Sequence, residues 1–249
     1  MITERQKQLL DFIVREYVKS AEPVGSALVF GKGNFQVSPA TIRNDMQVLE
    51  NQGYLAQPHT SAGRMPTDKA YRWFVNTLLS QEDYDIPTRD KRKIEDTLIR
   101  AGDNPHELNR TAAQVLQELS DSAVIANIRG ARDFYKVGLT SLLGFPEFQE
   151  FEQIFQLTSF FEHFDQLFNQ VEQEILGTLK DELGFGIFIG RENPFQSTGD
   201  ETVIVAQYNL PHRYAGSLTV IGPTRMDYRR NIGLVNYASQ FLNKLASQK

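Results

Sequence analysis

The chain has 249 residues, 41% of them apolar, which is enough for two compact domains. It contains no cysteine, so disulfides, thiolate metal sites and a cysteine nucleophile are excluded. The net charge of −5 is uneven, because residues 1–79 hold nine Lys/Arg against seven Asp/Glu, whereas the rest hold 17 against 24. A basic part on an acidic chain permits a nucleic-acid-binding module but does not require one.

Three helices are predicted within the first fifty residues. Thr3 to Gln6 forms a capping box, and the helix that it opens carries a wide apolar stripe. A short helix follows over 23–30 and ends in the segment 31–33. A third helix runs over 38–53, and three such helices fit a helix-turn-helix arrangement.

The third helix has both ends marked. Ser38 is a favoured N-cap, Pro39 falls at the first helical position, and Gly53 ends the helix. One face carries Ile42, Met46 and Leu49 and is predicted to pack on a core.

The opposite face of this helix is small, polar and cationic. Arg, Asn and Gln can make paired hydrogen bonds to the edges of guanine and adenine in a major groove. A solvated surface helix has the same kind of face, so the helix alone leaves both interpretations open. If it binds DNA, the contacting residues are expected to be Ser38, Ala40, Thr41, Arg43, Asn44 and Gln47.

A hairpin is predicted directly after this helix. Its strands cover 54–57 and 64–66 around a turn-rich tip, which is typical of a wing. His59, Thr60, Ser61 and Arg64 supply donors for phosphates or the minor groove. A lone histidine in a turn is more often simply solvated. The helix that starts at Thr67 is rich in aromatic residues, which fit a core or a dimer contact better than a base-stacking surface.

The rest of the chain predicts an α+β domain behind a helical connector. The connector covers 80–120 and contains two helices. Over 121–249 we expect strands at 124–128, 185–190, 202–208 and 217–221, a phenylalanine-rich helical segment at 147–183, and a last helix at 227–246. The phenylalanines fit a hydrophobic core better than an exposed dimer or chaperone surface.

Five segments carry a resemblance to a known family. The segments are Pro23–Ser26, Ser38–Met46 and Gln57–Arg64, continued by 66–72 and by a distant match over Val220–Tyr228. In these segments the chain resembles HrcA, the family of bacterial heat-inducible transcription repressors, over roughly 1–80 and 139–249.

The resemblance implies a winged helix-turn-helix domain over 1–79 and a GAF-like antiparallel sheet domain over 121–249. It implies a homodimer that binds an inverted-repeat operator in double-stranded DNA upstream of chaperone genes. It also implies that the GroE chaperonin supports folding of the repressor. In one place the chain departs from the family pattern: an inserted dimerisation segment is expected before Tyr135, but only 129–134 are present, so this segment is reduced or missing.

Two other classes of function are alternatives. Against an enzyme, the four histidines are scattered and there is neither a nucleophile elbow nor metal-ligand spacing, so no catalytic, metal or cofactor site is predicted. A chaperonin-dependent interaction protein that has lost DNA affinity is the other alternative. The start of the chain lacks a signal peptide's apolar run and no stretch of 18 apolar residues occurs, so we expect a cytoplasmic protein with no membrane partner.

Overall fold

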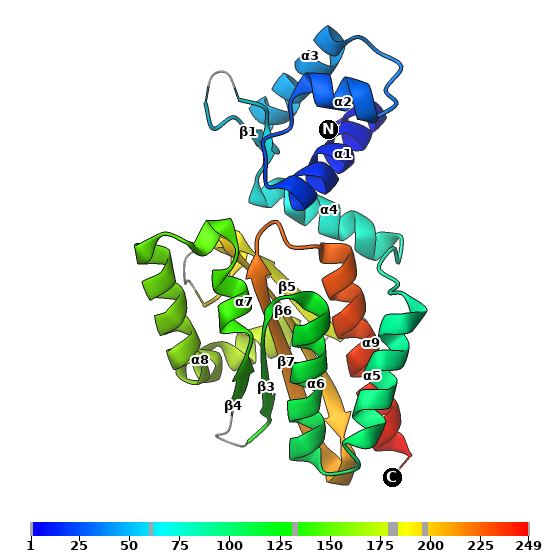
Figure 1. The fold of residues 1–249 in the computed structure, drawn as a ribbon, viewed down its shortest axis with the longest axis vertical. Coiled ribbons are helices and arrows are strands. Elements are labelled where there is room, and N and C mark those ends of the chain that lie inside the picture. The colour runs from blue at the N-terminus through cyan, green and yellow to red at the C-terminus, as the bar shows by residue number, and fades with distance from the viewer. Residues whose placement is uncertain (1, 60–61, 131–133, 179–183, 196–198, 249) are drawn as a thin grey trace. The chain divides into compact units, whose positions relative to one another are not determined.

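The computed structural model describes residues 2–59, 62–130, 134–178, 184–195 and 199–248 (Figure 1). The chain divides into two compact units. The first comprises the residues up to Asp83 together with Arg225–Asp227, and the second comprises Tyr84–Thr224 and the residues from Tyr228 onward.

The first unit is a helix-turn-helix followed by a short hairpin, which confirms the predicted order. Its elements are α1 (Glu4–Ser20), α2 (Ser26–Lys32), α3 (Pro39–Asn51), β1 (Leu55–Ala56), β2 (Met65–Pro66) and α4 (Asp68–Ser80). The capping box at Thr3 is present, and α1 ends at Ala21 in the left-handed conformation. Ile42, Met46 and Leu49 are buried, so the apolar face of α3 was predicted correctly.

The second unit is built on a five-stranded antiparallel sheet of order β4-β3-β7-β6-β5. Its strands are β3 (Ala123–Ile128), β4 (Phe134–Val137), β5 (Phe185–Ile189), β6 (Glu201–Leu210) and β7 (Tyr214–Pro223). Its helices are α5 (Thr88–Arg100), α6 (Pro105–Ser120), α7 (Leu139–Leu143), α8 (Phe151–Thr178) and α9 (Tyr228–Ser247), with short 3-10 turns at 146–148, 190–192 and 211–213. The two helices of the expected connector, α5 and α6, therefore lie in the second unit.

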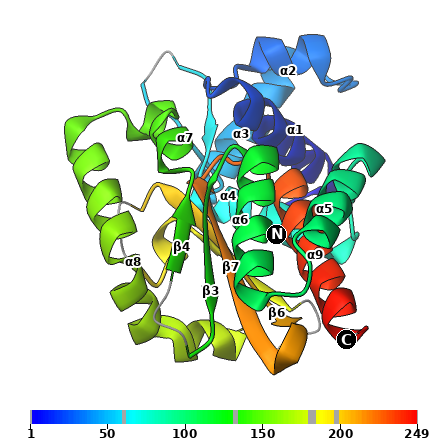
Figure 2. The ribbon, with the colours of Figure 1, turned by 60° about the horizontal axis from the view of Figure 1, so that its bottom comes forward.

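Helices cover both faces of this sheet. On one face α6 packs on β3 and α9 on β6, and Tyr208 of β6 donates a hydrogen bond to Asn109 of α6. On the other face α7 and α8 pack against alternate residues of the strands, among them Ile125 and Val203. In Figure 2 the strands run between α8 on one side and α6 with α9 on the other. The antiparallel sheet with packed helices confirms the α+β fold class.

The phenylalanine-rich segment forms a core, as predicted. Phe160, Phe164 and Phe168 are buried, and their rings meet that of Phe195, with centroids 5.7, 5.1 and 6.4 Å away, respectively. Two members of the segment are different: the side chains of Phe151 and Phe155 are 82% and 63% exposed. The helix begins only at Phe151, and 179–183, which the prediction also made helical, lie outside the described residues.

No helix in the described ranges has the length and apolar character needed to cross a membrane.

Candidate nucleic-acid interface

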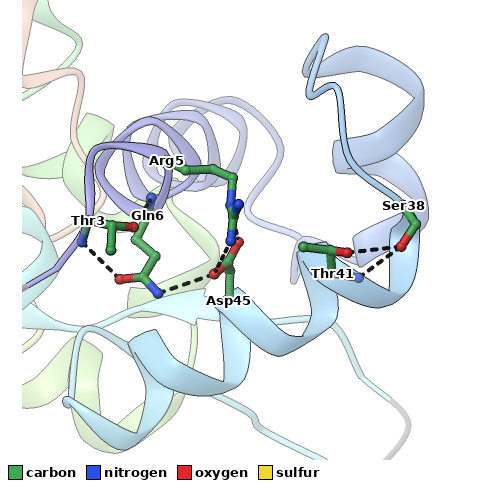
Figure 3. Close-up of polar contacts among 6 residues, drawn as sticks. All are labelled: Thr3, Arg5, Gln6, Ser38, Thr41 and Asp45. Atoms are coloured by element: carbon green, nitrogen blue, oxygen red, sulfur yellow. Dashed lines mark hydrogen bonds and ion pairs between the residues drawn. The ribbon is translucent and has the colours of Figure 1, made fainter.

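The N-terminus of α3 is fixed by its own first residues. The Ser38 hydroxyl accepts a hydrogen bond from the amide of Thr41 at 3.2 Å, and the two hydroxyls lie 3.0 Å apart (Figure 3). Pro39 follows at the first helical position, where no amide hydrogen is required. The cap leaves Ser38 and Ala40 exposed at the start of the helix.

A buried carboxylate holds α3 on α1. Asp45 is only 6% exposed, and it accepts bonds from Arg5 Nε at 2.7 Å, Arg5 Nη2 at 3.2 Å and Gln6 Nε2 at 3.1 Å (Figure 3). Gln6 is also the far end of the capping box with Thr3, so the start of α1 and the middle of α3 share one network. Burial pushes the pKa of Asp45 up, but the bonds from Arg5 and Gln6 outweigh it and hold that pKa below its usual value.

The face of α3 that points away from this network is exposed. It carries Ala40, Arg43, Asn44, Gln47 and Asn51. Arg43 is exposed on this face and has no hydrogen-bond or ion-pair partner within the described residues. The structure thus places the five predicted residues Ala40, Thr41, Arg43, Asn44 and Gln47 along one helix, with Thr41 half-buried.

The wing is anchored to the segment before α2. The backbones of Val24 and Arg64 exchange two hydrogen bonds of 2.9 Å. A Cβ at Gly63 would lie 2.5 Å from the carbonyl carbon of Val24, so glycine is needed here for close approach of two backbones.

The predicted wing residues have different surroundings. His59 is exposed, and Thr60 and Ser61 lie outside the described residues. The side chain of Arg64 is only 13% exposed, and its Nε lies 2.9 Å from Glu50 Oε2 on α3. A hollow of about 410 Å³ lies between α2, α3 and the wing, and Arg43, Gln57 and Arg64 line it.

Two residues that organise this site, Asp45 and Glu50, were missed by the sequence analysis. Asp45 precedes Met46 and lies three residues after Ile42, which places a carboxylate beside the apolar face of the helix. A charge in that position signals a buried partner. Glu50 carries no comparable signal, because its partner Arg64 is brought to it only by the hairpin.

Family profiles match most of the chain. The family described as HrcA protein C terminal domain matches residues 74–232, which is more than half of the chain. The family described as DeoR-like helix-turn-helix domain matches residues 33–66, the part that contains α3 and the wing.

Individual relatives match nearly end to end. Proteins named heat-inducible transcription repressor HrcA from Caldanaerobacter subterraneus and Geobacter sulfurreducens are 26% and 28% identical over 341 positions. These alignments cover 99% and 98% of this chain and 97% and 98% of the relatives. Since the chain has 249 residues, at least 92 of the 341 positions (341 less 249) are gaps in this chain.

A solved structure shares the fold. It is described as the crystal structure of a hypothetical protein, is 21% identical and superposes with a TM-score of 0.78 over 100% of both chains.

Proposed function

Because this chain belongs to the HrcA family of heat-inducible transcription repressors, we propose that it binds an inverted-repeat operator as a homodimer and represses heat-shock genes. The partner is double-stranded DNA, and the place of action is the cytoplasm. The proposed contacts are the N-cap Ser38, then Ala40, Thr41, Arg43, Asn44 and Gln47 on α3, and His59, Thr60 and Ser61 in the wing.

The observation that carries this proposal is the exposed polar face of α3. A major groove admits an α-helix, and Arg, Asn and Gln are the side chains that pair with guanine and adenine edges. Arg43, Asn44 and Gln47 are all exposed on that face, and the wing is bonded to the helix that presents them. The network around Asp45 fixes the helix from behind, so base-contacting groups are carried on a rigid element.

A dimer is proposed because one recognition helix covers too few base pairs for tight binding. Single DNA-binding modules bury limited area, and a two-fold dimer matches an inverted repeat. Support from the GroE chaperonin for folding is a further proposal that rests on the family alone.

We propose that the two parts of the chain have different functions. DNA binding resides in residues 1–79, and 121–249 form a GAF-like regulatory domain on which the helices of 80–120 pack. We place the missing positions between β3 and β4, since only 129–133 join these two strands. On this proposal the inserted dimerisation segment expected there is reduced or missing, and the two copies make contact elsewhere.

The test is a change at Arg43. We expect Arg43→Ala to weaken binding to the operator by about 1–3 kcal/mol relative to scrambled DNA, because a paired contact to a base is lost. The operator would first be selected from a random duplex library by the wild-type protein, and affinities measured by fluorescence anisotropy.

Arg100→Ala is the matched control, since it removes an exposed arginine from α5 in the other unit. Wild-type affinities of Arg43→Ala for both duplexes would contradict the assignment of α3 to the groove. A wild-type protein that selects no sequence would favour an interaction protein without DNA affinity.

A further inference from the structure

Arg64 is held inside the first unit by its side chain. Its guanidinium faces Glu50 of α3, and the exposed fractions of the two side chains are 13% and 25%. An arginine that contacts the DNA backbone donates hydrogen bonds to phosphate oxygens. Here the Nε donor is already bonded to a carboxylate, and the pair carries no net charge.

The backbone of Arg64 is held as well. Its amide donates to the carbonyl of Val24, and its carbonyl accepts from the amide of Val24, both at 2.9 Å. Gly63 allows the two backbones to approach this closely. Arg64 therefore joins the returning strand of the wing to the segment before α2 and, through Glu50, to α3.

The same guanidinium reaches a residue of the exposed face. Its Nη2 donates to Gln47 Oε1 at 3.4 Å, and Gln47 Nε2 donates to Asn51 Oδ1 at 3.2 Å. Arginine has donors only, so it selects the oxygen of the Gln47 carboxamide and determines which way that group points. Gln47 then keeps one Nε2 hydrogen, which can donate to adenine N7, and one Oε1 lone pair, which can accept from adenine N6.

We propose that Arg64 is a positioning residue: it orients the carboxamide of Gln47 for base reading and attaches the wing to α3. Its role is thus different from the direct phosphate contact that the sequence suggests. The inference rests on the proposed function, because it needs the face of α3 to read an operator.

The test uses the double variant Arg64→Met with Glu50→Gln, which removes the ion pair without changing the net charge. We expect roughly tenfold weaker discrimination at one base pair of each half-site, the one that Gln47 reads. The slope of log affinity against log salt should stay at the wild-type value, because no phosphate contact is lost. Adding Gln47→Ala to the double variant should cause no further loss of discrimination at that base pair.

Arg64→Lys separates the two roles without removing the charge. Lysine serves a phosphate as a point charge, but it lacks the fork that spans Glu50 and Gln47. We expect this variant to keep its affinity for non-specific duplex and to lose discrimination at the same base pair. The matched control is Arg100→Met, which removes an exposed arginine of the other unit and should change neither readout.

The measurements are enrichment from a random duplex library and anisotropy titrations at several salt concentrations. A fall in the salt slope of about 0.9 per protomer in the double variant, with full base discrimination, would overturn the inference in favour of a phosphate contact. Full discrimination by Arg64→Lys would do the same. If the wild-type protein enriches no sequence, the proposed function falls, and this inference with it.

Discussion

At the residue scale, we expect Asp45 to contribute to the loss of stability of the first unit in acid. Its folded pKa is below the value of about 3.9 for an unfolded chain, so it stabilises the folded state above that pH. This stability is lost as the pH falls from about 5 through the lowered folded pKa. We expect Asp45→Asn to lower the free energy of unfolding by about 1–2 kcal/mol at pH 7 and to flatten the loss below pH 5.

The measurement is urea unfolding between pH 3 and pH 7, followed by the fluorescence of Trp73, the only tryptophan, which lies on α4 of the same unit. Asp11→Asn is the control, because the carboxylate of Asp11, which pairs with Arg15, is more exposed than that of Asp45, and exposed pairs contribute little. An acid profile of Asp45→Asn that parallels the wild type would show that another group causes the loss.

Residue by residue, the sequence predicts what local chemistry decides. Ser38, Pro39 and the apolar positions of α3 act within one or two turns, so their roles follow from spacing alone. The bonds of Asp45 to Arg5 and of Glu50 to Arg64 join residues 40 and 14 positions apart. Such partners depend on how helices and hairpin come together, which is why the network that holds the site was not predicted.

At the element scale, α9 packs closely against the segment 84–86 through its own Gly233. A Cβ at Gly233 would lie 2.1 Å from the carbonyl oxygen of Tyr84 and 2.6 Å from Ile86 Cγ2. A backbone atom cannot move aside as a side chain can, so Gly233→Ala must displace the segment 84–86. We expect a loss of about 1–3 kcal/mol in stability, although alanine favours the helix itself.

The control for Gly233→Ala is Gly31→Ala in α2, where the added Cβ meets nothing within 4 Å. That change should be neutral or stabilise by up to about 1 kcal/mol. Thermal unfolding followed by circular dichroism compares the two. Equal or higher stability of Gly233→Ala would mean that α9 does not depend on this close approach.

Elements with a strong pattern were predictable, and short ones were not. The helices α1, α3, α5, α6 and α9 follow from caps and apolar spacing, and their bounds differ by a few residues at most. The helix α7 has only five residues after Gly138, too few for a helical period, and it was missed. The order of the strands also could not be predicted, because β3 pairs with β7 across almost a hundred residues.

At the scale of the whole molecule, the proposed dimer requires a surface that joins two copies. The apolar residues of α4 are largely used within the protomer, since Tyr71, Phe74, Val75 and Leu78 are buried. Trp73 and Leu79 remain half-buried on the same helix. Phe151 and Phe155 are exposed on α8, in the second unit.

We expect a homodimer that uses α4, because that helix directly follows the wing in the unit that carries α3 and can set the distance between two recognition helices. Trp73→Glu should then give a monomer with weakened operator binding, whereas Phe155→Glu should remain a dimer. Solution mass with and without operator DNA measures this, and wild-type Trp73 emission should change on dilution if its side chain lies in the contact. A wild-type monomer at micromolar concentration, with emission that is unchanged on dilution and on addition of operator, would exclude the α4 dimer. Loss of the dimer in Phe155→Glu alone would indicate that the contact lies on α8 instead.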